Sequence, residues 1–389
     1  MHEQENLADV LRAYGFEAAR VEPIVMGNIN RTFRITVGDG QVKVSGGQVS
    51  GGGQVSGDQG SGSGGQVSGN QYILQRLNPI FGRQVHHDIE AVTLHIASRG
   101  MLTPRLVRSR SGGLWTEDEQ GGVWRVLTLI VGNILSEGAT PDLAREAGAL
   151  LGRFHLAVSD LDHEFCNVRP GVHDTERHRQ HLSEVLKTHQ AHASFTEVAR
   201  VGEAILGAFV DLPALGDLPA RIVHGDPKLN NVVFSPEGRA LCFIDLDTLS
   251  RMTIPIELGD AFRSWCNRTG EDSIDSTIDL DCLAAGMNGY ATACRNTQPS
   301  AGSVQRSAGS ILSPAEIAAI APAVETIGFE LAARFCADAL EESYFGWDRE
   351  GFPTASAHNL YRAKNQLSLG QSIAERRADV ARIVREAFA

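Results

Sequence analysis

Polar residues that could handle a phosphate group interrupt a pair of hydrophobic runs past the middle of the chain. The segment IVHGDPKLNNVVF, residues 222–234, carries Asp226, Lys228 and Asn231, and a later hydrophobic run, ALCFIDLDT, contains Asp245. Phosphoryl transfer to a hydroxyl group needs a base aimed at the nucleophile and oxygen ligands for Mg²⁺. An Asp and an Asn on one loop can divide these tasks, with Asp245 supplying a carboxylate from the end of the neighbouring strand.

Each of these residues also has a purely structural interpretation. Asp226 could cap an ordinary hairpin turn, and Lys228 could be a solvated turn residue instead of a cation that balances charge on a phosphate oxygen. His224 is expected to order the loop by hydrogen bonds and not to act as a second base. Asp247 could be a second metal ligand or a surface residue. The combination of residue types favours a catalytic loop over a hairpin.

The elements that must position these residues change character along the chain. Residues 32–37 alternate with period two, and hydrophobic strands are predicted at 71–78 and 123–133. A helical apolar face follows in residues 144–160, and SPAE at 313–316 is a helix-start signature before a long helix. The first third is therefore strand-rich and the remainder helix-rich.

One segment of the first third has an unusual composition. Residues 45–70 include 11 Gly and repeat the unit GQVSG three times. Such a tract cannot bury enough apolar surface to offset its ordering entropy, so we predict a disordered insertion. A Gly-rich phosphate cradle is the alternative, but a cradle needs a fixed strand–turn–helix context.

Composition sets limits on the class of protein. The chain has 389 residues, which is too many for one small core, and a formal net charge of −12. This charge argues against a general nucleic-acid or anionic-membrane surface. The acidic N-terminus does not resemble a signal peptide, no run of apolar residues is long enough to span a membrane, and the six Cys are scattered singly. We expect a cytoplasmic protein with reduced thiols. The sequence makes no prediction about oligomeric state.

The motifs HGDPKLNNV, ALCFIDLDT and LGDAFR together resemble the aminoglycoside phosphotransferase and choline kinase superfamily, whose members are relatives of protein kinases. Within it they are most similar to the N-acetylhexosamine 1-kinases, and the similarity extends to MGNINRTF, YILQRLN, GVHDT, FELAARF and HNLYRAKNQ. The resemblance implies an α+β, bilobal, protein-kinase-like fold. A nucleotide-binding lobe with an antiparallel sheet would span residues 1–131, and a mainly helical catalytic and substrate lobe would span residues 132–389.

The resemblance implies ATP and Mg²⁺ as cofactors and assigns roles to the catalytic loop. Asp226 would accept the proton of the substrate hydroxyl, assisted by Lys228, while Asn231 and Asp245 would hold Mg²⁺. Glu257 occupies a position where the family tends to have Asp, and the longer carboxylate could still brace the catalytic loop.

The resemblance also assigns nucleotide contacts in the first lobe. Arg76 would pair with the α- and β-phosphates at the strand position where protein kinases carry Lys, and Glu90 on the next helix could hold Arg76 in place. The hinge that meets adenine would run from Leu129 to Val131. The residues expected over the phosphates are Gly27, Asn28 and Asn30.

The acceptor is predicted to be a small molecule, with the anomeric hydroxyl of an N-acetylhexosamine as the best candidate. Glu330, Arg334 and Asp338 share one face of the long helix, where they could form either a surface ion-pair ladder or part of a pocket. The resemblance favours a pocket role for Arg334 and makes Asp174 and Tyr344 further candidates.

Other functions stay open from the sequence. An aminoglycoside acceptor would need a pocket rich in carboxylates, and choline would need an aromatic cage, for which 6% aromatic residues offer little. A non-catalytic nucleotide-binding protein or scaffold is the alternative from another class.

Overall fold

A computed structural model of the chain describes residues 2–24, 30–38, 66–135, 138–168, 171–270, 273–295 and 311–389. The chain divides into two compact units. The first contains residues 1–133, 161–167 and 241–247, and the second contains residues 134–160, 168–240 and 248–389. None of the helices within the described ranges has the length and apolar character needed to cross a membrane.

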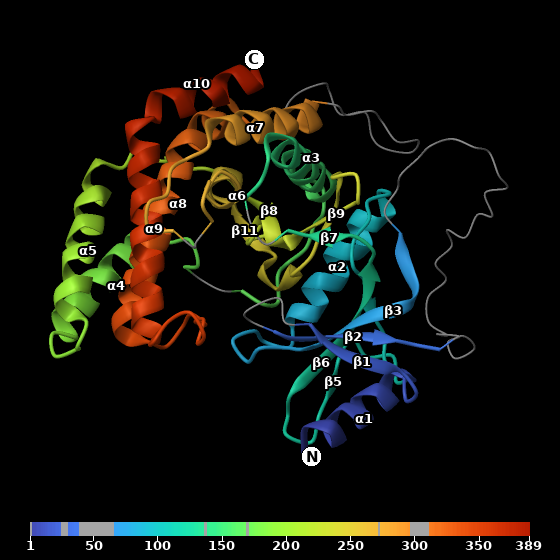
Figure 1. Ribbon diagram of the computed structural model, residues 1–389. Helices are drawn as coiled ribbons and strands as arrows, with labels where there is room; N and C mark the ends of the chain where they lie inside the picture. The colour runs from blue at the N-terminus through green and yellow to red at the C-terminus, as the bar shows by residue number, and fades with distance from the viewer. Residues whose placement is uncertain are drawn as a thin grey trace. The chain divides into compact units, whose positions relative to one another are not determined.

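The first unit is built on a six-stranded antiparallel sheet, with α1 and α2 on opposite faces (Figure 1). Its strand order is β1-β2-β3-β6-β4, and β5 pairs with β6. The bounds are α1 His2–Tyr14, β1 Arg20–Ile24, β2 Arg31–Thr36, β3 Val67–Arg76, α2 Val85–Ser98, β4 Leu106–Val107, β5 Thr116–Glu117 and β6 Val123–Ile130.

The face of this sheet toward α1 carries its own hydrophobic core. Val10, Leu11 and Tyr14 of α1 are buried there against Leu74 and Trp124 of the sheet. Successive side chains of a strand point to opposite faces. The neighbours of Leu74 and Trp124 along their strands therefore point to the α2 face, where the polar groups described below are found.

Strand β3 begins earlier than the sequence pattern predicts. Residues 67–70, placed in the disordered insertion by their composition, are part of β3, while residues 45–65 lie outside the described residues. Pairing with neighbouring strands accounts for the difference, because Val67 lies opposite Ile130 and the Val37 amide donates to the Asn70 carbonyl oxygen (2.9 Å). Pairing with residues that are distant in the sequence thus outweighed the local preference of residues 67–70 for disorder.

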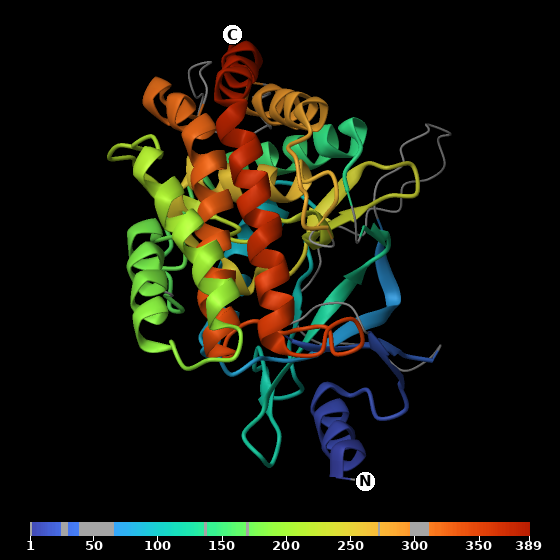
Figure 2. The same cartoon turned by 60° about the vertical axis from the view of Figure 1, so that its left-hand side comes forward.

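The second unit is mainly helical. Helices α8 and α9 lie side by side, with α4 and α5 packed against α8 (Figure 2). The bounds are α3 Pro141–Val158, α4 Thr175–Thr188, α5 Phe195–Ala208, β8 Ala220–Val223, η2 Leu229–Asn231, β9 Val232–Phe234, β11 Ser250–Thr253, α6 Ile254–Trp265, α7 Leu280–Arg295, α8 Pro314–Glu341, α9 Ala355–Glu375 and α10 Arg377–Phe388. Shorter elements are β7 Asn133–Ile134, η1 Phe209–Asp211, β10 Ala240–Phe243 and η3 Leu246–Thr248.

Two helices of the second unit confirm details of the sequence pattern. Ser313 and Glu316 form the predicted capping box at the start of α8. Helix α3, predicted from its apolar face, packs closely on α7. The approach is so close that a Cβ atom on Gly148 would lie only 2.1 Å from the carbonyl oxygen of Gly286. The predicted α+β class, with an antiparallel sheet followed by a helical part, is therefore confirmed.

Candidate functional site

The segment that carries Asp226 is a loop held between elements and not a hairpin turn. Strand β8, which precedes it, pairs antiparallel with β11, while the loop passes through η2 into β9. The hairpin interpretation required β8 and β9 to pair with each other. Asp226 therefore occupies a loop whose two ends are anchored in different sheets.

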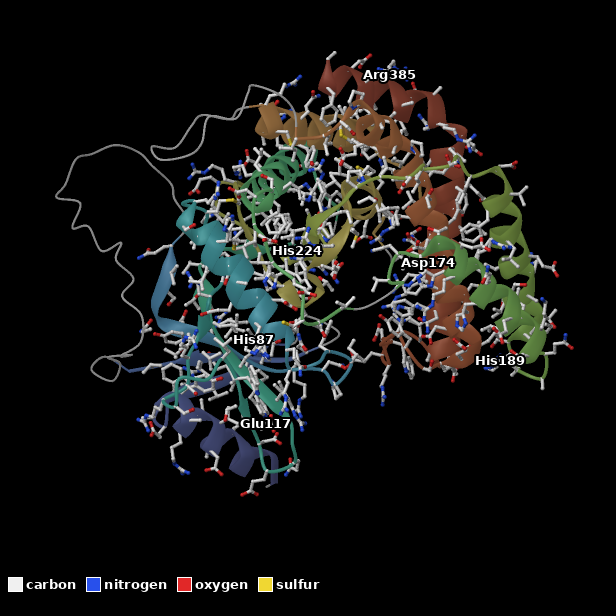
Figure 3. The ribbon with its side chains drawn as sticks, turned by 180° about the vertical axis from the view of Figure 1, so that it is seen from behind. His87, Glu117, Asp174, His189, His224 and Arg385 are labelled. Atoms are coloured by element: carbon white, nitrogen blue, oxygen red, sulfur yellow. The ribbon has the colours of Figure 1, made fainter. Side chains whose placement is uncertain are left out.

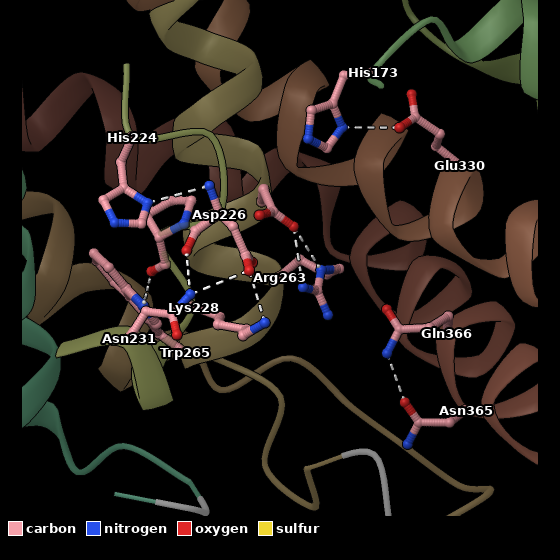
Figure 4. A network of polar contacts seen from close by, with 12 residues as sticks. His173, His224, Asp226, Lys228, Asn231, Arg263, Trp265, Glu330, Asn365 and Gln366 are labelled. Atoms are coloured by element: carbon pink, nitrogen blue, oxygen red, sulfur yellow. Dashed lines mark hydrogen bonds and ion pairs between the residues drawn. The ribbon is translucent and has the colours of Figure 1, made fainter. Parts of the chain in front are cut away.

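Lys228 and Asn231 converge on the Asp226 carboxylate (Figure 4). Lys228 Nζ donates to Asp226 Oδ2 at 2.7 Å, and Asn231 Nδ2 donates to the same oxygen at 3.1 Å and to the Asp226 backbone oxygen at 2.9 Å. Both side-chain donors thus use one carboxylate oxygen. The other, Oδ1, accepts no hydrogen bond from the described residues.

The electrostatics keep Asp226 ionised. Burial alone would raise the pKa of this carboxyl, but the charge and hydrogen bond of Lys228, with His224 and Arg263 nearby, lower the pKa below its ordinary value. The side chain is 21% exposed, so a small molecule can reach it. An ionised, partly exposed carboxylate with one oxygen that accepts no hydrogen bond from the described residues is suited to accept one from a hydroxyl group.

The amide of Asn231 is oriented by the loop itself. Because its Nδ2 donates to Asp226, its Oδ1 points away as an acceptor, and it has no hydrogen-bond donor among the described residues. Asp245 follows β10 with a left-handed backbone, φ 61°. Amide and carboxylate oxygens are the ligand types that Mg²⁺ prefers, so each of the two side chains has the chemistry to bind the ion. The described residues contain no cluster of three or more His, Cys, Asp or Glu that could hold a metal.

A buried relay braces the loop from behind. Glu257 on α6 accepts the Gly225 backbone N–H at 2.8 Å with Oε1, and its Oε2 contacts His155 Nε2 on α3. His155 Nδ1 in turn lies 2.9 Å from the hydroxyl of Tyr290 on α7. All three side chains are at most 2% exposed. The expected contact of Glu257 with the loop that carries Asp226 is therefore present.

Further contacts fix the loop's conformation. Gly225 has φ 84°, and a Cβ atom there would lie 2.2 Å from the Thr248 carbonyl oxygen, so this position requires glycine. His224 is buried, and its Nδ1 accepts the Asp226 N–H at 3.3 Å, as expected of a structural histidine. The indole N–H of Trp265 donates to the Pro227 carbonyl oxygen at 2.9 Å.

Asn30 is the described member of the set predicted to lie over the phosphates. Its Nδ2 donates to Asp247 Oδ2 at 2.6 Å, and its Oδ1 accepts the Asn78 N–H at 2.8 Å. Gly27 and Asn28 lie outside the described residues. Asp247, for which a surface position was one interpretation, is fully buried.

Arg76 and its neighbour Gln75 point to opposite faces of the sheet. Arg76 lies opposite Trp124 in register and 5.9 Å from its ring, on the α1 face, whereas Gln75 lies opposite Arg125 and accepts its hydrogen bonds. With Arg31, Arg76 lines a pocket of about 300 Å³. The side chain that faces Asp247 from β3 is therefore Gln75, and the phosphate contact of Arg76 stays a prediction.

The predicted pairing of Glu90 with Arg76 is wrong. Glu90 Oε1 accepts a hydrogen bond from Arg108 at 2.9 Å, and the ion pair of Arg76 is a 3.5 Å contact with Asp118. The analogy with protein kinases predicted that the Glu90 carboxylate of α2 contacts Arg76 of β3. In this chain Arg76 points to the face that α2 does not cover.

The end of β6 carries the predicted hinge. Leu129 is half-buried and Val131 is 52% exposed. The Val131 N–H donates to the Gln66 carbonyl oxygen at 2.9 Å, as a continuation of the pairing with β3. An adenine that used this N–H would have to displace Gln66, so the hinge role of Val131 stays a prediction.

The predicted acceptor residues on α8 do not form a surface ladder. Glu330 is buried and accepts hydrogen bonds from His173 Nδ1 (2.9 Å) and Thr175 Oγ1 (2.6 Å). Asp338 is also buried, and its two oxygens accept backbone N–H groups of residues 343–345 and Nδ2 of Asn359. Neither carboxylate is left to pair with Arg334.

Arg334 is half-buried between aromatic rings. Its guanidinium carbon lies 5.9 Å from the Tyr344 ring and 5.6 Å from the Phe345 ring. It forms no ion pair or hydrogen bond with the described residues. Arg334 thus presents donors that the described residues do not use.

The hydrogen bond between His173 and Glu330 also affects the histidine. Burial would lower the pKa of His173, but its hydrogen bond to Glu330 raises that pKa overall.

Asp174 has a structural task in the described fold. It is the N-cap of α4, and Figure 3 labels it beside that helix; the side chain is exposed and accepts the Arg177 N–H at 3.0 Å. Its neighbours His173 and Thr175 are the residues that bind Glu330. The structure therefore brings the Asp174 segment to α8 through its neighbours and not through the carboxylate itself.

Sequence reasoning missed Arg125 and the His155–Tyr290 relay. Arg125 is a lone charge inside the hydrophobic strand VWRVLTLI, and it is 1% exposed. A buried charge requires a partner, so that isolated Arg was the available sequence signal. Its partner, Asp247, lies 122 residues away along the chain, which no local pattern identifies.

Comparison with known proteins places this geometry in context. The model of the family described as "Phosphotransferase enzyme family" matches residues 62–292, more than half of the chain. Similar solved structures include an amicoumacin kinase in complex with AMP-PNP, Ca²⁺ and Ami, with a TM-score of 0.58, 13% sequence identity, and coverage of 95% of this chain and 93% of that chain.

Two further structures have the same fold. An aminoglycoside phosphotransferase from Alicyclobacillus acidocaldarius has a TM-score of 0.54 and 14% identity, covering 95% of this chain and 96% of that chain. A choline kinase from Cryptosporidium parvum has a TM-score of 0.54 and 10% identity, covering 97% and 96%. At these identities the likeness concerns the fold.

Proposed function

The chain belongs to the phosphotransferase enzyme family, and from this premise we propose that it transfers the γ-phosphoryl group of ATP to a hydroxyl group of a small molecule. The observation that carries the proposal is the arrangement at Asp226. Lys228 and Asn231 both donate to Oδ2, while Oδ1 is left without a donor among the described residues. A substrate hydroxyl can donate to Oδ1 in a fixed direction.

The loop residues have distinct tasks in this proposal. Asp226 orients the acceptor hydroxyl and takes its proton as the bond to phosphorus forms. Lys228 keeps the carboxylate ionised and stabilises negative charge that develops beside it. Asn231 Oδ1 and the Asp245 carboxylate are the oxygens that would hold Mg²⁺, which supplies charge neutralisation to the bound triphosphate.

The acceptor we propose is the anomeric hydroxyl of an N-acetylhexosamine, giving a sugar 1-phosphate. Arg334 supports a neutral, oxygen-rich acceptor, because its half-buried guanidinium offers several hydrogen-bond donors and has no carboxylate partner among the described residues. A site built from such donors discriminates strongly between hydroxyl-bearing substrates.

The same contacts disfavour the two rival acceptors. An aminoglycoside is polycationic and needs free carboxylates, but those of Glu330 and Asp338 are occupied by internal hydrogen bonds. A quaternary ammonium such as choline needs an aromatic cage. The rings of Tyr344 and Phe345 already face the cation of Arg334.

An ADP-release screen tests this proposal. The acceptors are N-acetylglucosamine, N-acetylgalactosamine, glucose, choline and kanamycin, and the Asp226→Asn protein is assayed beside the unaltered one. We expect stimulation by an acetylated sugar, with ³¹P NMR showing coupling of the product phosphorus to the anomeric proton. Stimulation by choline or kanamycin alone would overturn the acceptor. Binding of MgATP with no turnover on any acceptor would favour a non-catalytic protein.

A further inference from the structure

A buried arginine joins the sheet of the first unit to the turn that contains Asp245. Arg125 on β6 is 1% exposed, and both of its terminal nitrogens reach the carboxylate of Asp247, Nη2 to Oδ2 at 2.8 Å and Nη1 to Oδ1. Asp247 is also 1% exposed. Two parallel bonds between a guanidinium and a carboxylate fix direction as well as distance.

Two neutral amides complete this network. Gln75 Oε1 on β3 accepts Arg125 Nε at 2.9 Å and Nη2 at 2.7 Å. Asn30, which directly precedes β2, donates to Asp247 Oδ2 at 2.6 Å. Every charged group in the network therefore has hydrogen-bond partners, which is the condition under which a buried ion pair is tolerated.

The network ends two residues from a strained position. Asp245 has φ 61°, a conformation that costs a non-glycine residue of the order of 1–2 kcal/mol. Such a conformation persists only when its surroundings hold it. Asp247, two residues further along this turn, is buried, and both of its carboxylate oxygens accept hydrogen bonds from Arg125 on β6.

We propose that Arg125, acting through Asp247, is the positioning residue for the Asp245 carboxylate, a role that rests on the proposed function. The protein-kinase arrangement links a strand lysine to a helix glutamate. Here the strand offers neutral Gln75, and the helix carboxylate Glu90 is engaged by Arg108. The buried cation comes instead from β6 and acts on the metal-binding turn directly.

The buried histidine near this ion pair, His86, does not supply a second positive charge to Asp247. His86 on α2 is buried, and its Nδ1 lies 2.7 Å from the Arg83 carbonyl oxygen, which requires Nδ1 to donate. Burial, with the positive charge of Arg125, lowers the pKa of His86 to about 4, so the imidazole is neutral at physiological pH. Loss of Arg125 would therefore leave Asp247 buried without a cation.

Calorimetric titration of ATP with and without Mg²⁺ tests this inference, because the Mg²⁺-dependent gain in affinity reports on the metal ligands without requiring turnover. The variants are Arg125→Met/Asp247→Leu, which replaces the ion pair by apolar groups that a fold can accept, and Arg125→Lys, which keeps the charge and loses the fork. Arg221→Met is the matched control, since it removes the 2.9 Å ion pair of Arg221 with buried Glu316 in the second unit.

In the double variant we expect ATP affinity without Mg²⁺ to change by less than about threefold, and the Mg²⁺-dependent gain to fall by about 10- to 100-fold, as for other residues that orient metal ligands. Arg125→Lys should lose part of the gain and Arg221→Met none. If the double variant folds and its Mg²⁺-dependent gain in ATP affinity is unchanged, the positioning role is overturned. If the double variant does not fold, an unchanged gain in Arg125→Lys overturns it. Absence of any gain in the unaltered protein would overturn the proposed function as well.

Discussion

Removal of the Glu257 carboxylate tests most directly how the loop that carries Asp226 is held in place. Glu257→Ala leaves the Gly225 N–H and the His155 ring nitrogen buried without their partner. Breaking such a buried charged contact costs about 3–5 kcal/mol. At about 2–4 °C per kcal/mol for a unit of this size, the melting temperature should fall by about 6–20 °C.

Glu257→Gln is the matched control, because its amide keeps an oxygen for Gly225 and places an N–H toward His155. We expect it to lose about 1 kcal/mol, within the usual contribution of a hydrogen bond. Both variants are compared by thermal unfolding, by urea unfolding and by the rate of phosphoryl transfer at saturating ATP. Equal stability of the Ala, Gln and unaltered proteins would refute the assignment of Glu257 as the brace of the loop.

Further predictions concern single side chains. Arg334→Leu should raise KM for the acceptor by about 10- to 100-fold, the equivalent of one or more charged hydrogen bonds, and leave KM for ATP unchanged; equal effects on both would contradict an acceptor role. Because the fold lowers the pKa of His86 to about 4, from about 6.5 when unfolded, its contribution to stability is complete above pH 6.5 and is lost as pH falls toward 4. At pH 5 the loss in the free energy of unfolding is about 2 kcal/mol, and His86→Gln should lack this part of the acid destabilisation in urea unfolding. The same pH dependence of the unfolding free energy in His86→Gln and in the unaltered protein would contradict this prediction. Gly225→Ala should destabilise by about 2 kcal/mol or more, whereas Gly207→Ala, where nothing lies within 4 Å, should be tolerated in the same thermal assay.

The sequence predicted those features that depend on local pattern. Period-two alternation located β2, hydrophobic runs located β3 and β6, an apolar face located α3, and the capping box at Ser313 is present as expected. The candidate site residues Asp226, Lys228 and Asn231 were recognisable because they lie within one short segment and contact one another.

Features that depend on distant partners were not predictable in this way. Strand geometry puts Arg76 and Gln75 on opposite faces of β3, but the sequence could not show which of the two lies on the face with Trp124, because that depends on register with β6. Nor could it pair Glu90 with Arg108, or extend β3 into a Gly-rich tract that by composition alone favours disorder. In each case a contact with another strand or helix decided the outcome.

Phosphoryl transfer from MgATP to an N-acetylhexosamine by Asp226→Asn, with ATP affinity measured on the same samples, tests the central claim most directly. The asparagine retains the shape and one oxygen but cannot accept a proton. We predict a fall in rate of about 10²- to 10⁴-fold, the usual range for loss of a general base, with ATP affinity changed by less than about threefold. Turnover by Asp226→Asn at the rate of the unaltered protein would contradict the account.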